Sequence, residues 1–209
     1  ASREGRSYVL KFAPREAEDS ETVRTAFERE IWHATRLQSE FFPAAFVPEP
    51  ASSLYYALDY TQAPTLRQLL AESGPLETAD AVELGRFVLR AEQFLLRHDF
   101  IHGDLKPENI LVLRRNGEVE FKLIDLGSVA EVFSVQGRAG TPSYLAPERF
   151  AGAPMTERTE LFALGVTLYE ALSGKLPYGE IEPFQKPVFG KVKPLAKLNP
   201  LVPAWLEAV

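Results

Sequence analysis

The sequence predicts an α+β fold in two lobes, a small strand-rich lobe followed by a mainly helical one. The 209 residues, 45% of them hydrophobic, can build a sizeable core divided between two lobes that share a cleft. Segments rich in β-branched and aromatic residues lie before residue 61, whereas the longest helical patterns come later. Pro64 breaks the chain between the two regions, and we place a hinge there.

Composition narrows the classes of partner. The net charge is -6, so bulk electrostatics give no reason to expect nucleic acid or an anionic membrane as a partner. The sequence has no Cys, which suits a reducing compartment, and its apolar stretches are too short for a membrane span or a signal peptide. We therefore expect a cytoplasmic segment that neither crosses a membrane nor binds nucleic acid.

The first elements predict a strand followed by a helix. "RSYVLKFA" alternates along residues 6–13 and reads as a strand, and Ser20 can cap the helix that follows. Glu30 falls within the apolar stripe of that helix, together with Val23, Phe27, Ile31, Ala34 and Leu37. An unpaired carboxylate facing the protein would be costly, so Glu30 needs a partner.

A second strand and a long helix lead to the middle of the chain. "SSLYYALDY" reads as a strand, and a short helix is expected after Pro64. Asp80 with Glu83 predicts a capping box at the start of a long amphipathic helix. This helix delivers the chain to "IHGDLKPENIL", residues 101–111.

A hairpin then brings two oxygen ligands together. Asn116-Gly117, between "ILVL" and "VEFKLI", is a strong signal for a two-residue turn. With this turn, Asn109 lies opposite Ile124, so Asn109 and Asp125 emerge side by side at the open end. Beyond it, "ELFALGVTLYEALSG" predicts a buried helix ending at Gly174, and the Pro-rich remainder predicts ordered loops.

Five segments, in order, resemble the protein kinase family over most of the chain. "YVLKFA" is similar to the lysine-bearing strand, "EREIWHATRL" to the following helix with its glutamate, and "HGDLKPEN" to the catalytic loop. "DLG" resembles the metal-binding tripeptide, and "GTPSYLAPE" the end of the activation segment. The resemblance implies a two-lobed kinase-like fold, and "LSGKLPYG" with "NPLVPAW" resembles bacterial serine/threonine kinases, including those fused to a phosphatase domain.

The resemblance implies a nucleotide site that holds ATP. Lys11 is expected to hold the α and β phosphates, and Glu30 to hold Lys11, which is the partner that the helix pattern requires. Leu58 falls at the gatekeeper position. The carbonyl of Asp59 and the amide of Thr61 are expected to bind adenine.

The resemblance also implies the chemistry of transfer. Asp104 is expected to orient the substrate hydroxyl and accept its proton, and Lys106 to counter charge on the transferring phosphoryl group. Asn109 and Asp125 would be ligands of Mg²⁺, which binds largely through the nucleotide phosphates. His102 is expected to be structural. Lys106 favours Ser or Thr of a protein as the acceptor.

The activation segment carries the regulatory expectations. Thr141 is expected near the substrate-docking end, and Glu148 in an ion pair with an Arg that the sequence before Val209 does not offer. Gly103 stands where many kinases have an Arg that pairs with a phosphate. We therefore expect that phosphorylation of Ser128, Ser134 or Thr141 does not activate through position 103.

The sequence also predicts where the lobes divide, and it differs from the usual kinase pattern at two places. We place a partial N-lobe at residues 1–61 and the C-lobe at 62–209. No Gly-rich loop precedes Lys11, so we expect a fragment of a longer protein that binds nucleotide weakly by itself, with any fused regulatory or phosphatase domain outside it. Glu160 replaces the usual Asp at the start of the buried helix.

The leading hypothesis is ATP- and Mg²⁺-dependent phosphorylation of protein Ser or Thr. One alternative is a pseudokinase or regulatory binding module, suggested by the missing Gly-rich loop and by Glu160. The other is a small-molecule phosphotransferase of kinase-like fold, because "HGD" followed by a later Asn is typical of such enzymes. Lys106 and "GTPSYLAPE" argue against the last.

Overall fold

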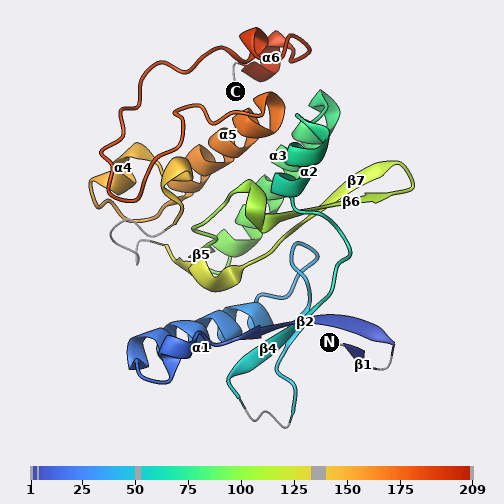
Figure 1. Cartoon of the computed structure of the whole chain (residues 1–209), viewed down its shortest axis with the longest axis vertical. Coiled ribbons are helices and arrows are strands. Elements are labelled where there is room, and N and C mark those ends of the chain that lie inside the picture. The colour runs from blue at the N-terminus through green and yellow to red at the C-terminus, as the bar shows by residue number, and fades with distance from the viewer. Residues whose placement is uncertain (1, 4, 50–52, 133–139, 208–209) are drawn as a thin grey trace.

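A computed structural model describes residues 2–3, 5–49, 53–132 and 140–207. Its strands are β1 (Ser2–Arg3), β2 (Arg6–Phe12), β3 (Ala45–Phe46), β4 (Tyr55–Asp59), β5 (Phe100–Ile101), β6 (Ile110–Arg115), β7 (Glu118–Leu123) and β8 (Ala130–Glu131). Its α-helices are α1 (Glu21–Arg36), α2 (Leu66–Ser73), α3 (Thr78–Leu96), α4 (Pro147–Phe150), α5 (Glu157–Ser173) and α6 (Ala204–Glu207). Figure 1 shows the small strand-rich lobe below the larger helical one, which confirms the predicted α+β, two-lobed fold.

The small lobe is an antiparallel sheet with one helix beside it. The strand order is β1-β2-β4-β3, and Lys11 of β2 lies opposite Tyr56 of β4. The helix α1 begins after Ser20, whose side chain accepts a hydrogen bond from the Val23 N–H at 3.4 Å, as the capping pattern predicted. Its inward face buries Phe27 and Glu30, so the helix aims one carboxylate at the core.

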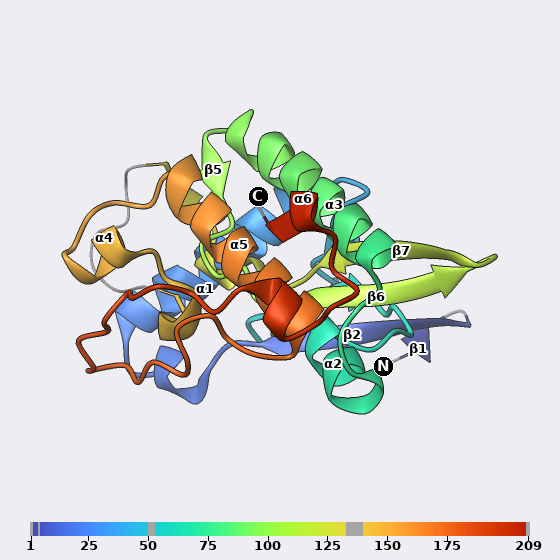
Figure 2. The same ribbon diagram turned by 90° about the horizontal axis from the view of Figure 1, so that it is seen from above.

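The large lobe is organised around two long helices, α3 and α5, which lie side by side (Figure 2). α5 ends at Gly174, whose φ of 67° is the left-handed conformation that the sequence led us to expect. The predicted capping box at the start of α3 is wrong: the helix begins earlier, after Glu77, and Asp80 and Glu83 instead bind arginines. The carboxylates of Asp80 and Glu83 form ion pairs and therefore do not cap the helix.

The hairpin β6–β7 has the predicted register. Arg115 pairs with Glu118 across a turn in which Asn116 and Gly117 have φ of 53° and 84°. At the open end, Ile124 donates its N–H to the carbonyl of Asn109 at 2.9 Å. The hairpin therefore delivers both of its open-end residues to the junction of the lobes.

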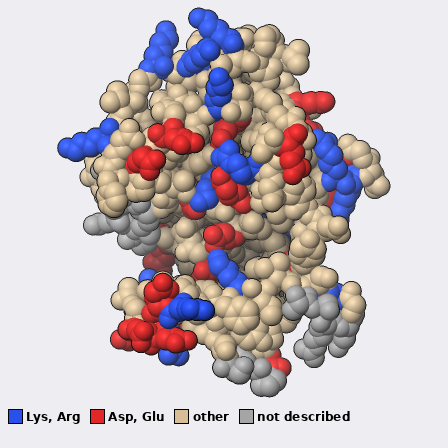
Figure 3. Space-filling model, in the orientation of Figure 1, with Lys and Arg blue, Asp and Glu red and all other residues tan. Residues whose placement is uncertain are grey.

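On the face drawn in Figure 3, acidic and basic side chains are mixed down the middle of the molecule. Among the described residues, no helix is long and apolar enough to cross a bilayer.

Candidate active site

Lys11 lies between two carboxylates that come from different lobes. Its Nζ is 2.5 Å from Oε1 of Glu30 on α1 and 2.6 Å from Oδ1 of Asp125, which follows β7. Glu30 is the only one of the three whose side chain is nearly buried, at 10% exposed. The contact that the helix pattern demanded for Glu30 is thus present, and it joins the lobes.

A phenol that the sequence reasoning missed completes this cluster. The hydroxyl of Tyr56 donates to Oε1 of Glu30 at 2.6 Å, and the ring is 1% exposed. Tyr56 faces Lys11 across the β2–β4 pair, which is why both side chains reach the same carboxylate. Burial, followed by the bond to Glu30, raises the pKa of Tyr56, so its hydroxyl remains a donor.

The ion pair between Lys11 and Asp125 determines the protonation state of both residues. Burial would lower the pKa of Lys11, but its bonds to Asp125 and Glu30 outweigh burial and raise it. Burial would likewise raise the pKa of Asp125, but the contact with Lys11 lowers it. Lys11 is therefore a cation and Asp125 an anion at neutral pH.

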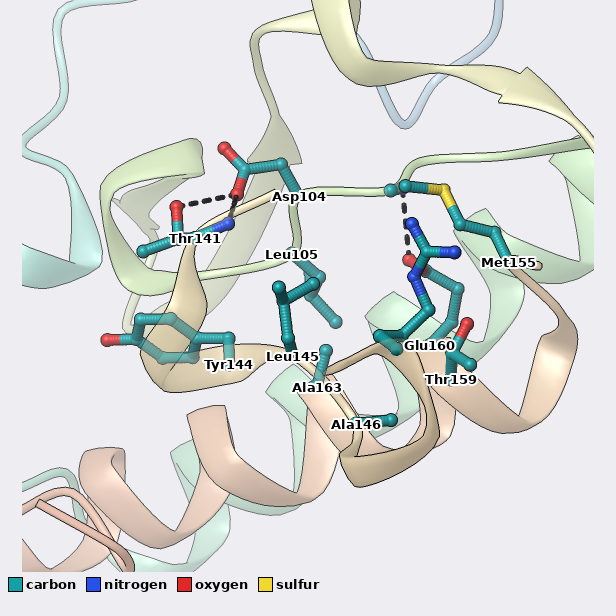
Figure 4. A pocket seen from close by; sticks show the side chains of 12 residues that line it. Asp104, Leu105, Thr141, Tyr144, Leu145, Ala146, Met155, Thr159, Glu160 and Ala163 are labelled. Carbon is teal, nitrogen blue, oxygen red and sulfur yellow. Dashed lines mark hydrogen bonds between the residues drawn. The ribbon is translucent and has the colours of Figure 1, made fainter. Parts of the chain in front are cut away.

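The loop of residues 102–109, here called the HGD loop, gathers a second polar cluster. Oδ1 of Asp104 accepts from the N–H of Thr141 at 2.9 Å and from its hydroxyl at 2.7 Å (Figure 4). Lys106 contacts Oδ2 of Asp104 at 2.7 Å and donates to the Thr141 hydroxyl at 2.6 Å. Asp104, Lys106 and Thr141 are thus in mutual contact across 37 residues of chain.

Asn109 is fixed by the same loop. Its Nδ2 donates to the carbonyl of Asp104 at 2.8 Å and to Oδ2 of that residue at 3.2 Å. The amide nitrogen therefore points at Asp104, and Oδ1 is left to accept from elsewhere.

Asp125 stands at a strained position beside this loop. Its φ of 65° and ψ of 76° place a non-glycine residue in the left-handed region, which typically costs of order 1–3 kcal/mol. Its Oδ1 accepts from the N–H of Gly127 at 3.4 Å as well as from Lys11. Such strain is often found where a side chain must point at a ligand.

The donor set tests whether a metal could bind. In the described ranges, no three His, Cys, Asp or Glu side chains converge. The available donors are the Asp125 carboxylate and Oδ1 of Asn109, both hard oxygens. Mg²⁺ typically takes one or two protein carboxylates and completes its shell with water and phosphate, so this set fits it.

Two residues hold the HGD loop from within. His102 is fully buried; its Nε2 lies 3.3 Å from the Ile124 carbonyl, and burial lowers the pKa of its ring. Glu160 accepts the N–H of Gly103 at 3.3 Å. Gly103 itself has φ of 80°, and a Cβ there would come within 2.6 Å of the Ser128 carbonyl oxygen.

Asp59 and Thr61, the residues expected to bind adenine, lie apart from the Lys11 cluster. Asp59 ends β4 and is exposed, and its N–H donates to the carbonyl of Ala44 at 2.8 Å. Thr61 lines a pocket of about 460 Å³ between the linker and the β6–β7 hairpin. The structure brings neither side chain to Lys11.

The remaining activation-segment residues are scattered. Ser128 is half-buried at the end of the 3-10 helix Leu126–Ser128, whereas Ser134 lies outside the described residues. Glu148 is exposed on α4, and no ion pair of its side chain is found in the described part of the chain. The ion pair expected for Glu148 therefore stays a prediction.

A further network near the HGD loop escaped the sequence reasoning. Arg67 of α2 donates to Glu108 at 2.7 Å, to Glu170 at 2.6 and 3.1 Å, and to the hydroxyl of Tyr144 at 2.6 Å. Tyr144 also donates to Glu170 at 2.6 Å. The network ties α2 and α5 to the segment that carries Thr141. Its members are 41 to 103 residues from Arg67, beyond the reach of any local pattern.

The sequence of this chain is similar to sequences of known proteins. A model of the protein kinase domain matches residues 1–197. The probable serine/threonine-protein kinase PknB of Lactococcus lactis is 29% identical over 90% of this chain and 32% of its own length. The serine/threonine-protein kinase pkn3 of Myxococcus xanthus is 32% identical over 81% and 33%, respectively. The serine/threonine-protein kinase PrkC of Bacillus subtilis is 26% identical over 92% of this chain and 31% of its own length.

This chain therefore spans about a third of the length of the curated relatives just described. The family model, by contrast, covers nearly all of it. Together with the Lys11 cluster and the HGD loop, that coverage is decisive. The chain belongs to the protein kinase domain family.

Proposed function

We propose that this chain is the catalytic domain of a serine/threonine protein kinase that uses ATP and Mg²⁺. The observation that carries the proposal is the position of Lys11, between Glu30 of one lobe and Asp125 of the other. We place the boundary of the lobes between residues 61 and 62. Phosphoryl transfer needs positioning and neutralisation of charge, and a cation held across the cleft supplies both.

In this proposal the small lobe binds the nucleotide. Lys11, oriented by Glu30, pairs with the α and β phosphates, and the backbone of Asp59 and Thr61 receives the adenine. Tyr56 keeps the Glu30 carboxylate in place through a hydrogen bond whose donor stays protonated.

Asp125 and Asn109 would hold the metal through a carboxylate and an amide oxygen. When bound, Mg²⁺ would neutralise negative charge on the phosphates. The Nδ2 bonds of Asn109 to Asp104 support this assignment because they fix which end of the amide is left for the ligand.

Asp104 is the proposed acceptor of the substrate proton, and Lys106 the cation beside the transferring group. Thr141 supports a protein acceptor over a small molecule because its bonds to Asp104 couple the activation segment to the HGD loop. We propose Ser or Thr of a protein as the acceptor, and the cytoplasm, where ATP is available, as the location. Any regulatory or phosphatase domain would lie in the longer protein.

The test measures whether the full-length protein, supplied with Mg²⁺ and γ-labelled ATP, transfers the labelled phosphoryl group to its own residues or to a generic protein substrate. Asp104→Asn is expected to lower kcat at least ~100-fold, the range for loss of a general base. Asp19→Asn, an exposed acid before α1, is the matched control and should retain wild-type turnover. Nucleotide binding without turnover in the wild type would favour a pseudokinase, and transfer only to small molecules would favour the other alternative.

A further inference from the structure

Two glutamates lie buried behind the HGD loop, on the facing helices α3 and α5. Glu92 is 7% exposed and Glu160 is 6% exposed. Both line a pocket of about 240 Å³ between these helices, with Leu89 and Leu161 among its apolar lining. Neither the nucleotide site nor the metal ligands explain why two acids should be buried together there.

The two carboxyls differ in what they bind. Glu160 accepts the N–H of Gly103, the residue before Asp104, at 3.3 Å (Figure 4 labels Glu160). Neither oxygen of Glu92 is within hydrogen-bonding geometry of a described group, although the backbone of His102 and the carboxyl of Glu160 face it. Glu92 is thus a buried carboxyl that faces another acid and has no ion pair with a cation among the described residues, which is a costly placement for an anion.

Electrostatics then dictate one shared proton. Burial, and next the charge of Glu160, raise the pKa of Glu92 well above its ordinary value. Burial raises the pKa of Glu160 to about 7, although the Gly103 N–H opposes this rise. Two facing carboxyls in an apolar setting cannot both ionise, so the pair keeps a proton at neutral pH.

The other titratable and charged groups around the pair do not remove this conclusion. Asp104 raises the pKa of Glu160, whereas the facing protonated carboxyl of Glu92 and the charge of Arg149 on α4 lower it. Glu157 lines the same pocket from the first turn of α5. His102 is held neutral at physiological pH by burial, so it supplies no cation to the pair.

We propose that Glu92 is a positioning residue: it retains its proton so that Glu160 remains the anionic acceptor of the Gly103 N–H and holds Asp104 in place. The inference rests on the proposed function, since it concerns the loop that carries out transfer. It assigns to α3 a role in the reaction, where helical periodicity alone would assign only packing.

The pair makes the loop sensitive to pH. Above about pH 7 Glu160 is ionised and binds the Gly103 N–H strongly; below it, both carboxyls are neutral and the bond weakens. The activity should therefore fall on the acid side with an apparent pKa that belongs to the pair.

The test compares Glu92→Leu with Glu92→Gln in the full-length protein, by kcat/KM against pH. The Gln amide can still donate to Glu160, so its acid limb should stay within about twofold of wild type. The Leu variant removes that donor and should move the limb to higher pH, with kcat/KM lowered on the order of tenfold near pH 6.5. Its melting temperature should equal or exceed that of the wild type, because a buried polar group has been replaced by an apolar one.

A purely structural role predicts the opposite pattern. Activity would follow the melting temperature at every pH, with no displacement of the acid limb, and that result would overturn the proposal. Glu92→Met, flexible and of similar volume, replaces the Leu variant should the latter fail to fold. It carries the same expectations and the same overturning result.

A second measurement does not depend on activity. The infrared C=O stretching band of an un-ionised carboxylic acid should be present in the wild type at pH 7.5 and strongly reduced in Glu92→Gln, in which position 92 has no carboxyl and Glu160 is mostly ionised. Its absence from the wild type would overturn the shared proton. Its presence in a protein that transfers no phosphoryl group would instead count against the proposed function alone.

Discussion

Replacing Tyr56 with Phe should weaken both the fold and the nucleotide site. The change removes one hydroxyl, which donates to Glu30 at 2.6 Å, and leaves the ring in its packing against Phe27, 5.9 Å away between centroids. A hydrogen bond to a charged group typically contributes about 1.5–3 kcal/mol, and the low end applies because Lys11 still binds Glu30. For a chain of this size, a loss of about 1.5 kcal/mol lowers the melting temperature by roughly 3–6 °C.

The effect on function follows from the same bond. A Glu30 carboxylate with one anchor fewer holds Lys11 less firmly, so kcat/KM for ATP should fall on the order of tenfold. Tyr55→Phe is the matched control: Tyr55 is next on β4, stacks on Phe12 at 5.1 Å, and its hydroxyl bonds to none of the described residues. Thermal melting and ATP kinetics on both variants decide the matter. Equal melting temperatures and equal kinetics in the two would refute the reasoning.

Three further outcomes are expected. Gly103→Ala should destabilise more than Gly117→Ala, because both have positive φ but only the first Cβ meets an atom, the Ser128 carbonyl oxygen; equal melting temperatures would contradict this. Phosphorylating Ser128 should leave kcat unchanged, since position 103 has no guanidinium to pair with the phosphate; a phosphatase-treated sample differing by orders of magnitude would count against it. The free energy of unfolding should fall by about 3 kcal/mol as pH rises from about 4.5 to about 7, because Glu160 binds its proton more tightly in the folded state. Urea denaturation at pH 5 and pH 7.5 measures the total fall; Glu160→Gln should remove the part due to Glu160, and a residual fall should remain because burial also raises the pKa of Glu92.

The parts of the site that could be predicted from sequence are those set by short-range rules. The turn at Asn116-Gly117 determines the hairpin register, and the register brings Asn109 to the open end beside Asp125. The position of Glu30 on the apolar face of α1 demanded a partner, and Lys11 met that demand. Each inference needed only the geometry of one element.

What could not be predicted depends on pairing between distant segments. Tyr56 reaches Glu30 because β2 and β4 pair in one particular register, and no short turn connects these strands to reveal it. Arg67 has its partners on three other elements, so no periodicity points to it. The wrong cap at Asp80 has a similar cause, since Arg114 of the distant strand β6 took its carboxylate at 2.5 Å.

Glu92 could have been found by the rule that found Glu30. It lies four residues after Val88 and three before Leu95, within the buried stripe of α3, so it too is an acid on an apolar face. The rule says only that such a carboxyl needs compensation, and the structure supplies it in two ways. Glu30 meets a cation, Lys11, and joins the lobes as part of an ion pair. Glu92 meets another acid, so its compensation must be a proton, and the same residue type on two helices becomes a charge in one place and a neutral donor in the other.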